Sequence, residues 1–304
     1  MHSTQFPIAF NQPLKLPIFE QYGYRVSVKR EDLVFPLASG NKWRKLKYNM
    51  EAFHSSTATA ILTFGGAFSN HLSATAALCA QENSNCFGIV RGNELQDKPL
   101  NPTLKQCHRD GMELVFVSRE EYALKEEGQS VKALASKEDV FILPEGGTNE
   151  LAVLGCKEIL SPTDDSYDAI VCAVGTGGTL AGLALTAAPH QKVVGFQVVK
   201  DASITDRIRT FATNNRWVVL PQWSQRKYAQ VDTSLVDFAQ HVLRQTGVLL
   251  DPVYTAPTLQ QLVHMIKNKK WTFGKNILLI HTGGTQGIAG FNTQKQLQWP
   301  EPQY

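Results

Sequence analysis

Residues Asp168–Ala187 read DAIVCAVGTGGTLAGLALTA, an apolar run that leads through a glycine-rich turn into a second apolar run. The first run is typical of a buried strand and the second of a helix. In this order they direct backbone N–H groups and the positive end of the helix at one point, where a phosphate binds well. A phosphate site at Gly175–Thr179 is one interpretation of the turn, and a tight connection between strand and helix is the other.

The turn lacks the signatures of two common nucleotide sites. It has no lysine in the position that a P-loop requires, and Leu180 stands where the dinucleotide fingerprint has its last glycine. A monophosphate therefore fits the turn better than a nucleotide, and a nucleotide-dependent oxidoreductase is disfavoured.

Similar units recur along the chain and predict an α/β fold with open, mainly parallel sheets flanked by helices. The predicted strands are Tyr24–Lys29, Ala60–Phe64, Cys86–Val90, Glu113–Val117, Val140–Leu143, Asp168–Val174, Lys192–Val199 and Asn276–His281. The predicted helices are Lys42–Phe53, His71–Gln81, Glu150–Leu160, Gly178–Ala187, Ser234–Gln245 and Pro257–Asn268. Ligands of such folds bind beyond the carboxyl ends of the strands.

Composition narrows the class of protein. The 304 residues are 43% hydrophobic and 19% charged, which provides for a large core, and one large or two medium domains are expected. The net charge of +3 comes without a basic patch, so nucleic acid is not expected as a partner.

The five dispersed cysteines indicate reduced, buried thiols, and no metal site is expected. No signal peptide or membrane-spanning run is visible, which favours a soluble cytoplasmic protein.

Lys42 follows a Gly40–Asn41 turn at the start of a predicted helix, within SGNKWRK. The helix N-terminus and the cations Arg44 and Lys45 would lower its pKa, as an amine nucleophile requires. A solvated helix start with ordinary basic residues is the alternative, and the spacing by itself does not decide between them.

A second glycine turn, GGAFSNH at Gly65–His71, follows the apolar run AILTF. Its backbone N–H groups could bind a carboxylate or a phosphate, although Ser69 or Asn70 as a helix N-cap is the simpler interpretation. The turn is not a G-x-S-x-G nucleophile elbow, and His71 is not an evident triad base.

Four further segments are less informative. DPVYT at Asp251–Thr255 and IHTGGT at Ile280–Thr285 are weak signals when taken singly. The polar segment Ser161–Asp168 is either a crossover between domains or a surface loop. From Asn292 onward no structure is assigned, because the tail is polar and lacks periodicity.

In this order, the clusters resemble the family of 1-aminocyclopropane-1-carboxylate deaminase and D-cysteine desulfhydrase. This family belongs to the pyridoxal-phosphate enzymes of fold type II, which are similar to the tryptophan synthase β subunit. The resemblance runs from about Val28 to Gly284 and is most specific in KREDL and SGNKWRKLKYN. LNPTL at Leu100–Leu104, GGTN at Gly146–Asn149 and DPVYT support it.

The resemblance implies pyridoxal 5′-phosphate as the cofactor, held as a Schiff base on Lys42. Lys45 would lie near the cofactor, and Asn70 would hydrogen-bond its phenolic oxygen. Ser69, Asn70 and His71 would receive the substrate carboxylate, with Ser69 also a candidate catalytic hydroxyl. Tyr254 and Tyr228 match two further catalytic positions of the family. The phosphate would be bound by Gly175, Thr176, Gly177, Gly178 and Thr179.

The resemblance also implies two domains with the cofactor between them, and a homodimer. The larger domain would combine residues 1–44 with 156–304, and the smaller would hold residues 45–155.

Two threonines bear on the substrate. Relatives that act on the cyclopropane amino acid typically have Glu at the position of Thr255 and Leu at that of Thr282, whereas both threonines match the desulfhydrase branch. A glutamate that faces the pyridine nitrogen keeps it protonated and strengthens the ring as an electron sink, whereas a threonine at Thr255 can only share a hydrogen bond with the cofactor. Departures from the family pattern at Ala256, Pro257, Ser73, Trp43 and Lys227 leave the substrate open.

We therefore expect β-elimination from a small amino acid, most similar to the conversion of D-cysteine to pyruvate, hydrogen sulfide and ammonia. The alternatives are ring opening of 1-aminocyclopropane-1-carboxylate to 2-oxobutanoate and ammonia, or another small-amino-acid lyase or racemase. A phosphate- or metabolite-binding protein without catalysis is more remote, because it would need none of Lys42, Ser69, Tyr228 and Tyr254 together.

Overall fold

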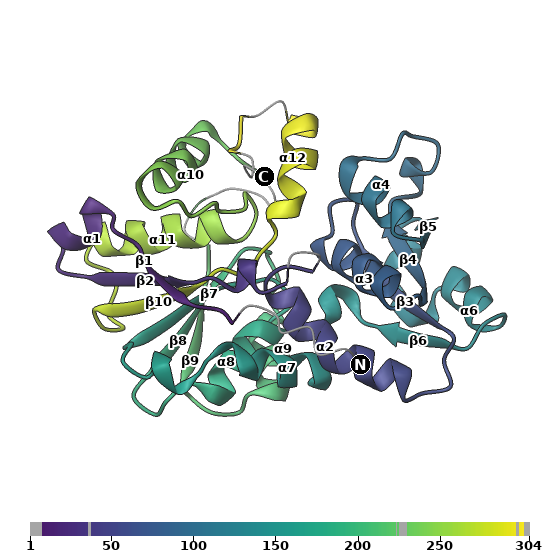
Figure 1. The fold of residues 1–304 in the computed structure, drawn as a ribbon, viewed down its shortest axis with the longest axis horizontal. Helices are drawn as coiled ribbons and strands as arrows, with labels where there is room; N and C mark the ends of the chain where they lie inside the picture. The colour runs from purple at the N-terminus through teal and green to yellow at the C-terminus, as the bar shows by residue number, and fades with distance from the viewer. Residues whose placement is uncertain (1–7, 36–37, 223, 225–229, 296–297, 301–304) are drawn as a thin grey trace.

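The computed structural model describes residues 8–35, 38–222, 224, 230–295 and 298–300. Its strands form two separate sheets, one of six strands and one of four. The larger sheet lies on the left in Figure 1 and the smaller on the right, with helix α2 (Asn41–His54) between them. The predicted α/β architecture is confirmed.

The larger sheet has the strand order β1-β2-β10-β7-β8-β9. Only β1 is antiparallel to its neighbour among these described strands. The carboxyl ends of the parallel strands therefore share one edge of the sheet. The strands are β1 (Asn11–Pro13), β2 (Arg25–Lys29), β7 (Ala169–Val174), β8 (Lys192–Gln197), β9 (Trp217–Leu220) and β10 (Asn276–Ile280).

Successive residues of the central strands pack into different cores. Ala169 and Val171 lie in the core beneath α1, α10 and α11, whereas Ile170 and Cys172 lie in the core with α7, α8 and α9 (Figure 1). Because both faces are covered, β7 is a continuous apolar run rather than an alternating one. The helices are α1 (Pro17–Gln21), α7 (Glu150–Cys156), α8 (Gly178–Thr186), α9 (Ile204–Phe211), α10 (Thr233–Thr246) and α11 (Thr255–Lys267).

The smaller sheet has the order β5-β4-β3-β6 and is parallel throughout. Ile61 packs with α2, α3 and α4 on one face, and Leu62 packs with α5 and α6 on the other. The strands are β3 (Ala60–Gly65), β4 (Asn85–Arg91), β5 (Met112–Val117) and β6 (Val140–Leu143). The helices are α3 (Asn70–Gln81), α4 (Pro102–Arg109), α5 (Arg119–Ala123) and α6 (Gln129–Ala135).

Every predicted strand and helix is present, and the structure contains several short elements that were not predicted. These are β1, β9, α1, α4, α5, α6, α9 and α12 (Ile288–Lys295). Segments this short gain their stability from tertiary packing rather than from their own pattern. The predicted helix Glu150–Leu160 ends early, at Cys156, and continues as a short 3-10 turn.

The prediction that no structure follows Asn292 was wrong. α12 extends to Lys295, and the indole of Trp299 is buried with its Nε1 donating to the Leu250 carbonyl at 2.9 Å. The amide of Asn292 also donates to the Trp299 carbonyl. A single buried aromatic residue thus anchors a polar tail that has no periodicity.

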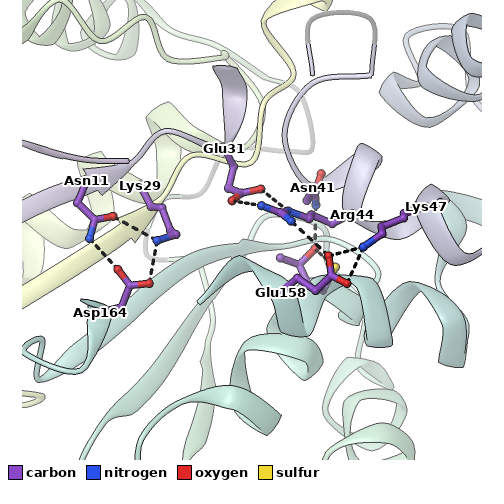
Figure 2. Close-up of polar contacts among 10 residues, drawn as sticks. Asn11, Lys29, Glu31, Asn41, Arg44, Lys47, Glu158 and Asp164 are labelled. Carbon is purple, nitrogen blue, oxygen red and sulfur yellow. Dashed lines mark hydrogen bonds and ion pairs between the residues drawn. The ribbon is translucent and has the colours of Figure 1, made fainter. Parts of the chain in front are cut away.

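The segment Ser161–Asp168 is not a plain surface loop. Asp164 is 1% exposed and accepts hydrogen bonds from Lys29 Nζ and Asn11 Nδ2, each at 2.7 Å (Figure 2). These bonds join the segment to β1 and β2 of the larger sheet. The strands divide between the two predicted segments of the chain, while the domain boundaries themselves stay a prediction.

Within the described residues, no helix is both long and apolar enough to cross a membrane.

Candidate active site between the two sheets

The start of α2 is fixed by a close backbone contact with the end of β10. Gly40 has a φ of +71°, and a Cβ atom built on it would lie 2.2 Å from the Thr282 carbonyl oxygen. Asn41 N donates to that same oxygen at 3.3 Å, and Gly40 N donates to the Glu31 carbonyl at 3.1 Å. Only glycine fits this turn, because any side chain would collide with backbone. The contact therefore fixes the position of the first turn of α2, which carries Lys42.

Lys42 projects from the first turn of α2 into the space between the sheets. Its Nζ donates to Asn41 Oδ1 at 3.0 Å. Burial of the amine and, second, the nearby charge of Lys45 lower the pKa of Lys42 from 10.5 to about 7. Asn41 in turn donates from Nδ2 to Thr179 Oγ1 at 2.8 Å, so the lysine is tied to the glycine loop after β7. The prediction of a depressed pKa is confirmed, although burial rather than Arg44 is the principal cause.

Lys45 lies one turn further along α2 and bridges the two halves of the molecule. Its Nζ donates to the Gly146 carbonyl, to Thr148 Oγ1 and to Thr176 Oγ1, at 2.9, 2.8 and 3.1 Å. All three protons of the ammonium group are thereby used. Burial lowers the pKa of Lys45 to about 8. Lys45 therefore reaches the glycine loop through the Thr176 hydroxyl.

Ion pairs of Arg44 and Lys47 also hold α2 in place (Figure 2). Arg44 forms a two-pronged ion pair with the fully buried Glu31, at 2.9 and 3.0 Å. Lys47 Nζ contacts both oxygens of Glu158, at 2.8 and 2.9 Å. Gly155 of α7 packs directly against the Arg44 carbonyl, where a Cβ atom would lie 1.8 Å from the oxygen. The helix that carries Lys42 is therefore held by ion pairs as well as by close backbone packing against α7.

The loop Gly175–Thr179 after β7 has its backbone donors free. Within the described part of the chain, the N–H groups of residues 176–179 donate to no backbone or side-chain acceptor. Gly177 has a φ of +90°, and a Cβ atom there would lie 2.6 Å from Ile208 Cγ1. Gly178 lies against Thr148 and is not part of the cavity wall, whereas the other four loop residues are.

The loop Gly65–His71 after β3 is built differently. Ser69 N donates to the Gly66 carbonyl at 3.0 Å, and Ser69 Oγ caps α3 by accepting from Leu72 N at 3.2 Å. The capping interpretation of Ser69 is thus confirmed. Among the described residues, the N–H groups of Asn70 and His71 have no acceptor. Asn70 also packs across to the larger sheet, because a Cβ atom on Gly284 would lie 2.8 Å from its Nδ2.

The ring of His71 cannot donate a hydrogen bond to the substrate. Thr63 Oγ1 donates to the Leu143 carbonyl at 3.0 Å and must therefore accept from His71 Nε2, 2.8 Å away. Burial and the charges of Lys42 and Lys45 hold the pKa of His71 well below its usual range. The ring is neutral, so only the backbone N–H of His71 can donate to a carboxylate.

The turn Asp251–Thr255 places Tyr254 and Thr255 on different sides. Tyr254 lines the cavity, near Gly175. Thr255 is buried and its hydroxyl donates to Asp251 Oδ1 at 2.6 Å, so the structure does not bring it to the cavity wall. Thr282, which follows β10, does line the cavity. Tyr228 lies outside the described residues.

These residues surround one cavity of about 740 Å³ at the carboxyl ends of both sheets. Arg91, which was not among the predicted site residues, is also part of the wall. Its place directly after a predicted strand was the available signal. The predicted residues in the wall are Lys42, Lys45, Ser69, Asn70, His71, Gly175, Thr176, Gly177, Thr179 and Tyr254.

The donor set fits pyridoxal phosphate. The free N–H groups of the loop at the positive end of α8 suit a phosphate dianion. The amine of Lys42, with a pKa of about 7, is neutral often enough to attack an aldehyde. In the described residues no group of His, Cys, Asp and Glu side chains is arranged to hold a metal ion.

Comparisons with known proteins agree with this geometry. Residues 6–283 match the family model described as pyridoxal-phosphate dependent enzyme. A Thermotoga maritima protein named as a candidate 1-aminocyclopropane-1-carboxylate deaminase is 35% identical, over 88% of this chain and 91% of that protein. The bifunctional D-cysteine desulfhydrase/1-aminocyclopropane-1-carboxylate deaminase of Arabidopsis thaliana is 31% identical, over 88% and 74%. The crystal structure of a homologue of the deaminase superposes with a TM-score of 0.84 at 25% identity, covering 95% of this chain and 93% of that one.

Proposed function

Because the chain belongs to the family of pyridoxal-phosphate-dependent enzymes, we propose that it eliminates the β-substituent of a small amino acid, with D-cysteine as substrate. D-Cysteine and water would give pyruvate, hydrogen sulfide and ammonia. The Cα–H and Cβ–S bonds break, the sulfur leaves with the bonding electrons and a proton, and water supplies the ketone oxygen of pyruvate.

The cofactor is pyridoxal phosphate. When bound, it supplies an aldehyde carbon for the amine of Lys42 or of the substrate, and a ring that takes up the electron pair left on Cα. The free N–H groups of Thr176, Gly177 and Thr179, which line the cavity, would hold its phosphate, with Lys45 acting through Thr176. Those of Asn70 and His71 would hold the substrate carboxylate.

Lys42 is the proposed base for the α-proton. Its pKa of about 7 lets one amine accept and return a proton near neutral pH. Tyr254 lines the same cavity and is the candidate acid for the departing sulfur. Ser69 already accepts a hydrogen bond from Leu72 N, and its hydroxyl proton stays available to the substrate.

The observation that carries the choice of D-cysteine is that the carboxylate of Asp251, which lines the cavity beside Tyr254, is already engaged by donors of the protein. Asp251 is the single carboxylate in Asp251–Thr255 and Ile280–Thr285, and its oxygens accept from three backbone N–H groups and the Thr255 hydroxyl. Thr282, an uncharged residue, also lines the cavity. Without an acid to protonate the pyridine nitrogen, the ring is a weaker sink, which suffices when the leaving group is good. Thr282, rather than the buried Thr255, is therefore the residue that favours D-cysteine.

Ring opening of 1-aminocyclopropane-1-carboxylate is a second candidate. It is favoured by the names of the relatives, since one of them joins both activities in a single chain and the candidate deaminase is 35% identical.

Purified holoenzyme should be assayed with D-cysteine, L-cysteine and 1-aminocyclopropane-1-carboxylate, following pyruvate, sulfide and 2-oxobutanoate. We expect pyruvate and sulfide from D-cysteine at a kcat/KM at least about tenfold above that of the other two. Turnover of the cyclopropane substrate alone would overturn the proposal. Thr282→Val, which keeps the shape of the side chain without its hydroxyl, should lower the rate with D-cysteine.

A further inference from the structure

A second cavity of about 810 Å³ lies at the carboxyl edge of the smaller sheet. Its wall includes Phe68 after β3, Glu94 after β4, Arg119 after β5 and Glu145 after β6. This is the edge at which parallel sheets bind ligands. The proposed elimination of a molecule as small as cysteine has no use for the additional space.

Arg91, the last residue of β4, belongs to the walls of both cavities. A Cβ atom built on Gly66 would lie 3.6 Å from one of its guanidinium nitrogens, so its charge is close to the loop Gly65–His71. The same loop bears the two free N–H groups proposed for the substrate carboxylate. A substrate bound there would therefore have Arg91 beside it, in the direction of the second cavity.

Of the three cations in the wall of the second cavity, Arg91 is the one without an ion pair among the described residues. Arg119 pairs with Glu94 at 2.9 Å, and Lys125 pairs with Glu145 at 2.8 Å. The second oxygen of Glu145 accepts from the Tyr122 hydroxyl at 2.7 Å.

The guanidinium carbon of Arg91 lies 5.6 Å from the centre of the Tyr122 ring, and within the described residues Arg91 forms no ion pair or hydrogen bond. Arg91 is exposed, and its charge is close enough to Glu145 to help lower the pKa of that carboxyl. With three cations and two carboxylates in the wall of the second cavity, one positive charge is still left without an ion pair in the described part of the chain.

We propose that Arg91 binds a second carboxylate of the substrate, so that the preferred substrates are amino acids with an anionic group beyond Cβ. This inference rests on the proposed function, because the first carboxylate is assigned to the N–H groups of Asn70 and His71. Guanidinium and carboxylate match in shape and charge, and a two-pronged bond to an otherwise unpaired arginine favours such a substrate over a neutral one.

A matched pair of substrates isolates that charge: S-carboxymethyl-D-cysteine and its neutral isostere S-carbamoylmethyl-D-cysteine. Elimination from the first breaks the Cα–H and Cβ–S bonds and consumes one water, giving pyruvate, ammonia and thioglycolate. The sulfur departs with the bonding electrons and is protonated.

In the wild type we expect kcat/KM for the carboxylate to exceed that for the amide about tenfold, the value of one partly solvated charge-assisted hydrogen-bond pair.

Arg91→Gln should abolish this preference by lowering kcat/KM for the carboxylate about tenfold more than kcat/KM for the amide. Arg109→Gln is the matched control, since it removes the same charge from the end of α4, outside both cavities. It should keep the preference. Arg91→Lys should retain part of it, because the charge remains but the fork is lost.

Equilibrium binding separates this inference from the proposed reaction. Adipate carries two carboxylates at the spacing of S-carboxymethylcysteine, and adipamate carries one; neither has an amine or a leaving group. Titration calorimetry on the holoenzyme should show adipate binding about tenfold more tightly, with the difference lost in Arg91→Gln and reduced by salt.

The outcomes are distinct. If adipate is preferred but neither cysteine derivative yields pyruvate, the anion site stands and the elimination function fails. Pyruvate formed equally from both derivatives, together with equal binding of adipate and adipamate, overturns the role of Arg91 and leaves the elimination intact. Equal losses with both ligands in Arg91→Gln would assign Arg91 to the first carboxylate and also overturn the inference.

Discussion

The two glycine loops that face the cavity differ in how they end. After β7, the loop Gly175–Thr179 enters α8 without a side-chain cap, and its four N–H groups from 176 to 179 stay free. After β3, the loop Gly65–His71 uses Ser69 to cap α3 and folds Ser69 N back on Gly66, so that two N–H groups remain. A loop that caps its own helix has fewer donors left for a ligand. The first loop is suited to a phosphate and the second to a carboxylate.

The side chains around the loops extend the contrast. Next to the first loop, the ammonium group of Lys45 is fully used by Gly146, Thr148 and Thr176. Next to the second, the guanidinium of Arg91 is unpaired among the described residues. The phosphate side is therefore completed within the protein, and the carboxylate side leaves a charge for the substrate to match.

The largest expected effect comes from filling the phosphate loop. Gly177→Ala would place a Cβ atom 2.6 Å from Ile208 Cγ1 at a φ of +90°. The loop would have to move, and its N–H groups would no longer point at one phosphate. We expect the affinity of the apoprotein for pyridoxal phosphate to fall between about a hundredfold and a thousandfold, a loss of about 3–4 kcal/mol. Fluorescence titration measures it.

Gly247→Ala is the matched control, with a φ of +68° and no atom within 4 Å of the added Cβ. It should cost about 1 kcal/mol of unfolding free energy through backbone strain and leave cofactor affinity unchanged. Equal losses of affinity in both variants would show that backbone strain, rather than the shape of the phosphate loop, is responsible.

The second prediction tests whether the carboxylate loop has a catalytic hydroxyl as well as a cap. Ser69→Ala should lower the free energy of unfolding by about 1 kcal/mol through loss of the cap. It should also reduce kcat with D-cysteine by about a hundredfold, because a positioned proton donor is lost. Steady-state kinetics and urea unfolding give the two quantities.

Ser118→Ala removes an equivalent cap, the bond from Glu121 N at 3.1 Å, at the start of α5 and outside both cavities. It should show the same loss of stability with full activity. If both variants keep full activity, Ser69 is a cap alone.

The smallest expected effect concerns the amine between the loops. Because burial lowers the pKa of Lys42 to about 7, the neutral amine is the minor form at pH 6 and the major form at pH 8. The rate at which pyridoxal phosphate attaches to the apoprotein should rise about tenfold across this range and level off above it.

Borohydride reduction and intact mass measure the attachment, which Lys42→Ala should abolish and Lys47→Ala should not. Lys47, paired with Glu158 and not part of the cavity wall, is the control. A rate that keeps rising toward pH 10 would contradict the lowered pKa of Lys42, and attachment that persists in Lys42→Ala would place the cofactor on another residue.

Much of this site follows from local patterns. The strand Ala169–Val174 and the loop after it could be predicted because a doubly buried strand must be apolar throughout and its loop must be glycine-rich. The depressed pKa of Lys42 was likewise predicted, although Arg44, one of the cations invoked, is neutralised by Glu31. Short elements such as β9 and α12 escaped because their own residues carry too little signal.

Other features depend on pairing between distant residues. Among the described residues, Arg91 has no ion pair because Glu94 pairs with Arg119 and Glu145 pairs with Lys125. Thr255 was expected at the cofactor, but the carboxylate of Asp251 turns its hydroxyl away, and Thr282 lines the cavity.

The sequence by itself determined the class of fold, the two glycine loops and the lysine, because each depends on residues that are neighbours in the chain. Only the tertiary structure decided which donors remain free, why Gly40 must be glycine against Thr282, and how Lys45 reaches Thr176. These contacts join residues more than a hundred positions apart, and no local pattern encodes a hydrogen bond to a partner that folding brings into reach.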